Sequence, residues 1–281
     1  MTIDHVISGL IYLICSYVLF YVGAFAYQKL HPKYSVDQEL FKKDNLALAI
    51  ALVGYYFGLI MGIGGAVIGP SRGLLWDIIE IFVDGALAIV LMNVSSFIND
   101  WFILYRFNIF KEIIDDHNSG TGAIVGAVYL STGLIIFGSF SGDGGSIFTA
   151  IVFWFLGQMV LAVSCLIYSI FSPYKIRQEI EKENVAAGVA FAGALLGIGN
   201  VLRVATSVDF TSWYRSLQIF IVYSVVALIL LPIIRRLTDW ILVPGETLSH
   251  EIAGQEKPNL GAAFIEAFSY LGASFLIGWS I

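Results

Sequence analysis

The stretch KKDNLALAIALVG, residues 42–54, changes at Asn45 from charged residues to an almost wholly apolar run. An asparagine at such a boundary is a typical helix N-cap, because its side-chain oxygen accepts a hydrogen bond from a free amide of the first turn. Related stretches follow at residues 115–127 (DDHNSGTGAIVGA), 181–193 (EKENVAAGVAFAG) and 255–267 (QEKPNLGAAFIEA). Each has small residues two and four positions after the asparagine. We therefore predict four related helices capped by Asn45, Asn118, Asn184 and Asn259.

The composition predicts that these helices lie in a membrane. Of the 281 residues, 58% are hydrophobic and only 13% are charged, which is far from the balance of soluble domains. A bilayer core of about 30 Å needs roughly 20 apolar helical residues, and period-2 alternation typical of a membrane barrel is absent. We predict an all-α integral membrane protein with about eight spans. They are expected at residues 4–28, 44–69, 75–101, 119–140, 146–171, 184–205, 212–234 and 259–280.

The distribution of basic residues predicts an orientation. Twelve of the fifteen lysines and arginines fall in the loops after the first, third, fifth and seventh spans. Arg72, Arg203 and Arg215 are the three on the other side. Because cytoplasmic loops carry an excess of Lys and Arg, we expect the four charged loops in the cytoplasm and both termini outside.

A longer repeat divides the chain into two halves. The third span ends in INDWFIL and the seventh in LTDWILVPG, and the loop PKYSVDQELFKKDN from Pro32 resembles SPYKIRQEIEKEN from Ser172. We predict two four-helix repeats, at residues 1–142 and 143–281. Because each contains an even number of spans, the repeats have the same topology and are related by an axis along the membrane normal.

The motifs KKDNLALAIALVGYYFGL (residues 42–59) and WDIIEIFVDGALA (residues 76–88) resemble the YjfL-like family of bacterial inner-membrane proteins, a domain of unknown function. The four-span unit would be present twice in tandem. The resemblance implies a multi-pass protein of the bacterial inner membrane and supplies no catalytic residues. The second copy departs from the pattern, with Arg215, Gln218 and Val222 where the first copy has acidic residues.

Those acidic residues are Asp77, Glu80 and Asp84, whose spacing of i, i+3 and i+7 puts them on one helix face. A carboxylate inside a membrane is costly unless it is paired, solvated or protonated. One interpretation is a ladder that forms a cation or proton path. The other is neutralisation by Arg72, Arg203 and Arg215, which we favour for Asp77 and leave open for Glu80 and Asp84. Glu266, about two turns inside the last span, has no obvious partner; a protonated carboxyl and a transport role are equally open.

Glycines recur at helical spacing at Gly54, Gly58 and Gly62, and again at Gly122 and Gly126. Small residues at intervals of four let helices approach closely in membranes. We favour close packing at these positions over the alternative of a pore lining.

Two hypotheses about function remain. No catalytic triad, metal-ligand spacing or cofactor motif is present, so we expect no enzyme, no catalytic residue, no metal and no cofactor, and nothing indicates nucleic acid. The first hypothesis, towards which we lean slightly, is a small-cation or proton-coupled transporter or channel using the acidic ladder. The second is a non-transporting scaffold that recruits cytoplasmic envelope-stress proteins through the charged loops. The partners expected are membrane lipid, a cytoplasmic peripheral protein and a second copy of the chain.

Overall fold

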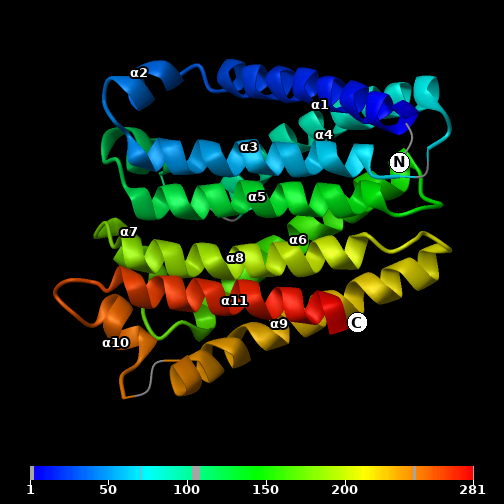
Figure 1. Ribbon diagram of the computed structural model, residues 1–281. Coiled ribbons are helices and arrows are strands. Elements are labelled where there is room, and N and C mark those ends of the chain that lie inside the picture. The colour runs from blue at the N-terminus through cyan, green and yellow to red at the C-terminus, as the bar shows by residue number, and fades with distance from the viewer. Residues whose placement is uncertain (1–2, 70, 103–107, 243–244, 281) are drawn as a thin grey trace.

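The computed structural model describes residues 3–69, 71–102, 108–242 and 245–280, and these ranges contain helices and no strand (Figure 1). Short helices precede the four asparagine-capped helices. The long helices are α1 (Ile3–Leu30), α3 (Leu46–Val67), α4 (Leu74–Phe102), α5 (Ser119–Ser141), α6 (Ile147–Phe171), α8 (Val185–Thr206), α9 (Trp213–Leu242) and α11 (Leu260–Ser280). The short ones are α2 (Val36–Phe41), the π-helical turn η1 (Lys111–Asp115), α7 (Ile176–Glu181) and α10 (Leu248–Ala253).

Length and composition make most of the long helices membrane spans. Within the described ranges, seven helices are long and apolar enough to cross a bilayer: α1, α3, α5, α6, α8, α9 and α11. The remaining long helix, α4, has 29 residues and is therefore about 43 Å long. It leads from the end of α3 back towards the start of α5. The predicted all-α membrane fold is confirmed.

The core of the molecule is a row of parallel helices, α3, α5, α8 and α11, which lie side by side (Figure 1). Glycines bring their backbones into contact. A Cβ at Gly54 would overlap the backbone of Gly126, and one at Gly122 would overlap that of Ala47. Gly58 meets the backbone of Tyr129, whereas a Cβ at Gly62 would lie 3.2 Å from the Ile136 side chain. These five predicted packing glycines thus all face a neighbouring helix.

The two ends of the row differ. The short helices α2, η1, α7 and α10 lie together at one end, which we call the short-helix end; the opposite end is where α1 begins and α11 ends (Figure 1). The sequences LYRFNIFKEIIDDH and LTDWILVPGETLSHEI predict interfacial segments after the third and seventh spans. The structure has a short helix after α1 and α6 as well. Arg106, one of the basic residues used for the orientation, lies outside the described residues.

One predicted helix end is wrong. The seventh span is expected to end at Ile234, but α9 continues to Leu242 and contains Pro232. Arg235 and Arg236 lower the hydropathy after Ile234. The sequence analysis placed the end of the seventh span at Ile234 because of this decrease. Arg235 is instead buried, with 7% of its surface exposed, because it finds an acidic partner inside the helix bundle. The assignment of Arg235 to a loop is therefore corrected.

Candidate functional site

The four asparagines stand at the N-termini of the parallel helices. The Oδ1 of Asn45 accepts a hydrogen bond from the Leu48 amide at 3.0 Å, and Asn118 accepts from the amides of Gly120 and Thr121. Asn184 accepts from Ala187 at 3.1 Å and Asn259 from Ala262 at 3.2 Å. Each asparagine therefore satisfies a first-turn amide that has no partner within its own helix.

The other side-chain atom of each asparagine binds a glutamate from the preceding short helix. Each Nδ2 donates to a carboxylate oxygen, at distances of 2.7–3.3 Å. The pairs are Asn45 with Glu39, Asn118 with Glu112, Asn184 with Glu179 and Asn259 with Glu251. The sequence analysis missed these glutamates, although the signal was present: a glutamate stands five to eight positions before each asparagine.

Three of the asparagines also link one short helix to the next. Asn45 Nδ2 donates to the carbonyl of Ile113, Asn118 to that of Ile180 and Asn184 to that of Ile252, at 2.8–2.9 Å. Each carbonyl belongs to the short helix of the following unit. We call these four asparagines with their glutamates and the three carbonyl bonds the Asn–Glu relay. These bonds join α2, η1, α7 and α10 into one row at the short-helix end.

Two glutamates of the relay, Glu39 and Glu179, are held as anions. Burial of Glu39 acts to raise the pKa of its carboxyl, but hydrogen bonds from Lys43 and Asn45 outweigh it and leave that pKa below its ordinary value. Glu179 follows the same balance, with Lys182 and Asn184 as donors that lower its pKa. Both carboxylates are therefore charged at neutral pH and strengthen the bonds from their asparagines.

The acidic face of α4 lies at the opposite end and is bonded differently from the prediction. Asp77 accepts hydrogen bonds from the hydroxyls of Tyr12 and Ser71, both at 2.5 Å, and from the Arg72 amide at 2.8 Å. The Arg72 guanidinium instead pairs with Glu80 at 2.9 Å. The favoured ion pair of Asp77 is therefore replaced by hydroxyls and a backbone amide at the start of α4. Asp84, one turn beyond Glu80, is half-buried.

The other two arginines form their side-chain hydrogen bonds within their own helices. Arg203 donates from Nε to the Asn200 side chain at 3.0 Å and lies over the Phe137 ring. Arg215 donates to Gln218 at 3.3 Å. In the contacts of the described residues, neither arginine reaches Asp77, Glu80 or Asp84. The alignment of Arg215 with Asp77 thus reflects the repeat and does not produce a pair between the halves.

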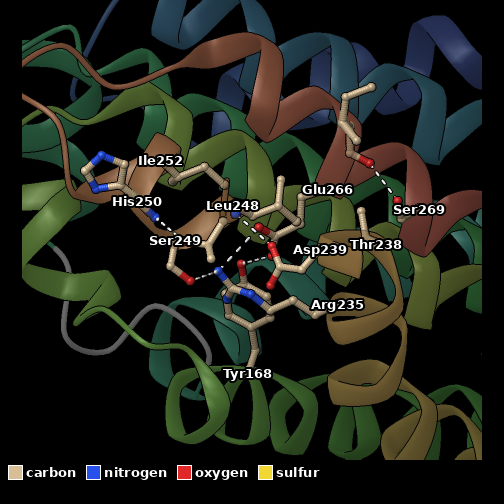
Figure 2. A network of polar contacts seen from close by, with 12 residues as sticks. Tyr168, Arg235, Thr238, Asp239, Leu248, Ser249, His250, Ile252, Glu266 and Ser269 are labelled. Carbon is tan, nitrogen blue, oxygen red and sulfur yellow. Dashed lines mark hydrogen bonds and ion pairs between the residues drawn. The ribbon is translucent and has the colours of Figure 1, made fainter. Parts of the chain in front are cut away.

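Glu266 is the most buried of the predicted carboxylates, and Figure 2 shows its surroundings. Its Oε1 accepts hydrogen bonds from Tyr168 at 3.0 Å and Tyr270 at 3.3 Å. Its Oε2 lies 3.5 Å from Arg235 Nη2. The guanidinium also lies over the Tyr174 ring, 5.3 Å from the centroid. Sequence reasoning gave Glu266 no partner because it placed Arg235 outside the bundle.

The predicted carboxylates therefore belong to two separate places. Asp77, Glu80 and Asp84 are near the opposite end, and Glu266 lies with Arg235 two turns inside the short-helix end. Among the described side chains, no group of three or more His, Cys, Asp or Glu could hold a metal ion. The best-defined polar structure is the Asn–Glu relay, which recurs in all four units.

This recurrence agrees with the comparison with known families. The family described as Domain of Unknown Function (DUF350) matches residues 1–140 and again residues 144–281. The chain belongs to the DUF350 family. The family domain is present in two tandem copies, which confirms a membrane family of unknown function with an internal repeat. The chain is also 27% identical over 247 residues to the UPF0719 transmembrane protein of Aquifex aeolicus (strain VF5), covering 86% of this chain and 88% of the relative. No solved structure matches the present chain.

Proposed function

We propose that this protein is a non-transporting scaffold of the bacterial inner membrane, akin to the YjfL-like proteins, with both termini outside. The short-helix end then faces the cytoplasm, as the excess of basic residues in its loops favours. The Asn–Glu relay carries the proposal, because it holds four short helices in a fixed row that a peripheral protein of the envelope-stress response can bind.

The surface of this row supports a docking role. Phe41, at the end of α2, is 83% exposed and is followed directly by the exposed Lys42 and Lys43. The buried face of α2 is held by Val36 and Glu39. An exposed aromatic side chain beside two lysines fits a partner with an apolar pocket and an acidic rim.

The packing of the long helices also favours a scaffold over a pore. The parallel helices touch at their backbones through Gly54, Gly58 and Gly122. The cavity between α8, α9 and α11 measures about 20 Å³, which is room for about one water. Such packing suits a rigid platform.

The test is photocrosslinking in living cells from a reactive amino acid placed at position 41. We expect one discrete crosslinked cytoplasmic protein, and none from position 76, where Trp76 is exposed at the opposite end. Introducing Asn118→Ala loosens the row and should weaken the crosslink while the protein stays in the membrane. Equal crosslinking from both positions would contradict the proposal.

The transport hypothesis remains the second candidate, supported by Asp84. This half-buried carboxylate follows Glu80 by one turn of α4, and the side chain of Glu80 is 40% exposed. A cation or proton could pass from one to the other. The test is flux into liposomes by wild type and by a folded Glu80→Gln/Asp84→Asn variant. Flux that only wild type supports would establish a pathway and overturn the scaffold proposal.

A further inference from the structure

The Asn–Glu relay follows one rule along the row of parallel helices. It has four units in chain order, each made of a short helix and the capped helix after it, with α3 and α11 at the two ends of the row (Figure 1). The asparagine of each unit donates to the carbonyl of the residue that follows the glutamate of the next unit. These residues are Ile113, Ile180 and Ile252 in the second, third and fourth units. The equivalent residue of the first unit is Leu40, which follows Glu39.

The last asparagine of the row is held like the other three but has a donor to spare. In every unit the backbone amide of the asparagine donates to the carbonyl of its glutamate, at 2.7–3.0 Å. The Asn259 Nδ2 also donates to the Glu251 carboxylate at 2.7 Å, and no carbonyl of the described residues accepts its second N–H. Asn259 is exposed, whereas Asn45, Asn118 and Asn184 are each at most 5% exposed.

The first unit offers the matching acceptor. Among the hydrogen bonds of the described residues, none ends on the Leu40 carbonyl. Leu40 is only partly buried. Ile113, Ile180 and Ile252, which each receive an asparagine from the preceding unit, are almost fully buried. The row therefore ends in a donor at the fourth unit and in an acceptor at the first.

The contact between α5 and α8 shows how one family copy joins the next. There the last capped helix of the first copy lies beside the first capped helix of the second copy, and α6 also packs against α5. As the first long helix of its copy, α1 corresponds to α6. Only 17% of the most apolar stretch of α1 is buried, against 44% for α6. The surface that α6 buries on the preceding copy thus stays open on α1.

We propose that a second copy of this chain continues the row, with its α2 and α3 beside α10 and α11 of the first. Asn259 of one copy then donates to the Leu40 carbonyl of the next copy, by the rule that joins the units within a chain. Because the two surfaces differ, the contact is head-to-tail, and its repetition gives a ring or a filament in the plane of the membrane.

The residues at the capped ends of the two helices permit this contact. Between the two family copies, Gly188, four positions after its cap, meets the backbone of Gly120, two positions after the preceding cap. The equivalent residues of the new contact are Ala49 of α3 and Gly261 of α11. Both are small and neither is buried within the single chain. The two backbones can therefore approach closely where the relay bond has to form.

Apolar surface continues from the capped ends along both helices. The exposed side chains are Leu46, Val53, Phe57 and Ile60 on α3 and Leu260, Phe264, Phe268 and Phe275 on α11. Nine positions after their caps, α3 and α8 have the contact residues Gly54 and Gly193, but α11 has Phe268. The two helices therefore meet at the caps and diverge farther along. Acyl chains can cover these surfaces but carry neither the donor nor the acceptor that matches the ends of the relay, so a second copy is the better fit.

Disulfide crosslinking of the full chain in liposomes tests the contact. The background carries Cys15→Ala and Cys165→Ala, which remove the two free cysteines. Ala49→Cys/Gly261→Cys then places one thiol on each of the two surfaces. Because the proposed contact brings these positions within disulfide range, a Cα separation of about 4.4–6.8 Å, oxidation should produce a ladder of dimers, trimers and longer species.

Single cysteines separate a head-to-tail contact from a symmetric one. Neither Ala49→Cys nor Gly261→Cys alone should crosslink, because the contact brings neither surface against itself. A mixture of the two single variants should give dimers and nothing longer. The matched control is Ala49→Cys/Trp279→Cys, since Trp279 is also exposed on α11 but lies at the opposite end. This control should not crosslink.

A second measurement tests the relay bond without new thiols. Asn259→Ser keeps a side-chain oxygen for the cap but is too short to reach the next copy. Energy transfer between fluorophore-labelled copies in liposomes should show association weakened roughly fivefold, because a hydrogen bond between copies is lost. Gln255→Ser is the matched control. Gln255 also donates to Glu251, at 2.6 Å, but lies outside the relay, so this variant should associate like wild type.

A ladder from Ala49→Cys/Gly261→Cys and weaker association of Asn259→Ser support the head-to-tail contact. Crosslinking by either single variant, equal crosslinking by the Trp279→Cys control, or none by a folded double variant would overturn it. So would wild-type copies that do not associate, or an Asn259→Ser variant that associates as well as wild type. If the double cysteine variant does not fold, the comparison of Asn259→Ser with Gln255→Ser still decides.

These results do not depend on the scaffold proposal, because no peripheral protein is present. The two proposals are also compatible in space. Phe41 has the position of Glu181, since each follows the residue whose carbonyl serves the relay. Glu181 stays exposed although α7 is joined to a preceding unit. Phe41 therefore remains free to bind a partner when a second copy is joined at Leu40.

Discussion

At the residue scale, the buried pair of Arg235 and Glu266 makes a sharp prediction. Glu266→Gln leaves the Arg235 charge in the bundle without its counter-ion, and breaking a buried pair in this way costs about 3–5 kcal/mol. Two guanidinium nitrogens, Nε and Nη1, already have no hydrogen-bond partner within the described structure. We expect a clear fall in the unfolding temperature of the purified protein.

The controls separate loss of the pair from a general effect of changing a glutamate. Glu256→Gln alters an exposed carboxylate and should leave stability within about 0.5 kcal/mol of wild type. The double variant Arg235→Leu/Glu266→Leu removes both charges and should recover most of the loss, because replacing a whole buried pair by apolar residues is often neutral. A Glu266→Gln variant as stable as wild type would mean that the carboxyl contributes no charge.

Single-residue partners were the least predictable feature of the sequence. The four asparagine caps follow from a local pattern, because a cap bonds amides within its own first turn. The partners of Asp77 could not be predicted: Tyr12 comes from α1, and Ser71 precedes α4 in a loop that no hydropathy pattern defines. Glu266 and Arg235 meet only because α9 continues past Ile234.

At the scale of one element, the Asn–Glu relay predicts that equivalent caps differ in importance. Asn118→Ala removes the cap of α5 and takes one donor each from the Ile180 carbonyl and Glu112, which keep the Glu183 amide and the Thr121 hydroxyl as donors. A lost cap costs about 1 kcal/mol, and each further hydrogen bond lost adds about 0.5–1.5 kcal/mol. We therefore expect the unfolding free energy to fall by about 2–4 kcal/mol.

Asn259→Ala is the matched comparison. Asn259 caps α11 and binds Glu251, but these bonds are exposed, so its replacement should cost only about 1 kcal/mol. Thermal unfolding of the two variants under identical conditions measures the difference. Equal losses would show that the bonds between neighbouring short helices contribute nothing to stability.

Elements were predicted more successfully than partners, for a physical reason. A span is a run of about 20 apolar residues, and such runs marked α5, α6 and α11 to within one residue of their observed ends. Short helices such as α2 and α7 bury only two residues each. They lack a long apolar pattern, so their existence depends on the asparagines and glutamates that hold them in place.

At the scale of the whole molecule, the two family copies share one fold and are not interchangeable. The duplication was visible in the sequence because the third and seventh spans end alike and the loops from Pro32 and Ser172 resemble each other. The buried pair of Arg235 and Glu266 in the second copy was not visible, because it forms only where α9 continues past Ile234. The copies meet where α5 packs against α8, and Gly188 touches the backbone of Gly120.

The contact between the copies predicts opposite effects for the same substitution at two glycines. Gly188→Ala puts a methyl group into the Gly120 backbone, and such overpacking typically costs 1–3 kcal/mol. At Gly272 in α11, a new Cβ would meet only the Phe268 ring, at 3.7 Å. Since alanine favours a helix by about 1 kcal/mol over glycine, Gly272→Ala should be neutral or stabilising. Thermal unfolding of both variants tests this. A loss at Gly272 equal to that at Gly188 would mean that the contact with Gly120 has no special weight, whereas a loss confined to Gly188 would show that this glycine contact holds the two copies together.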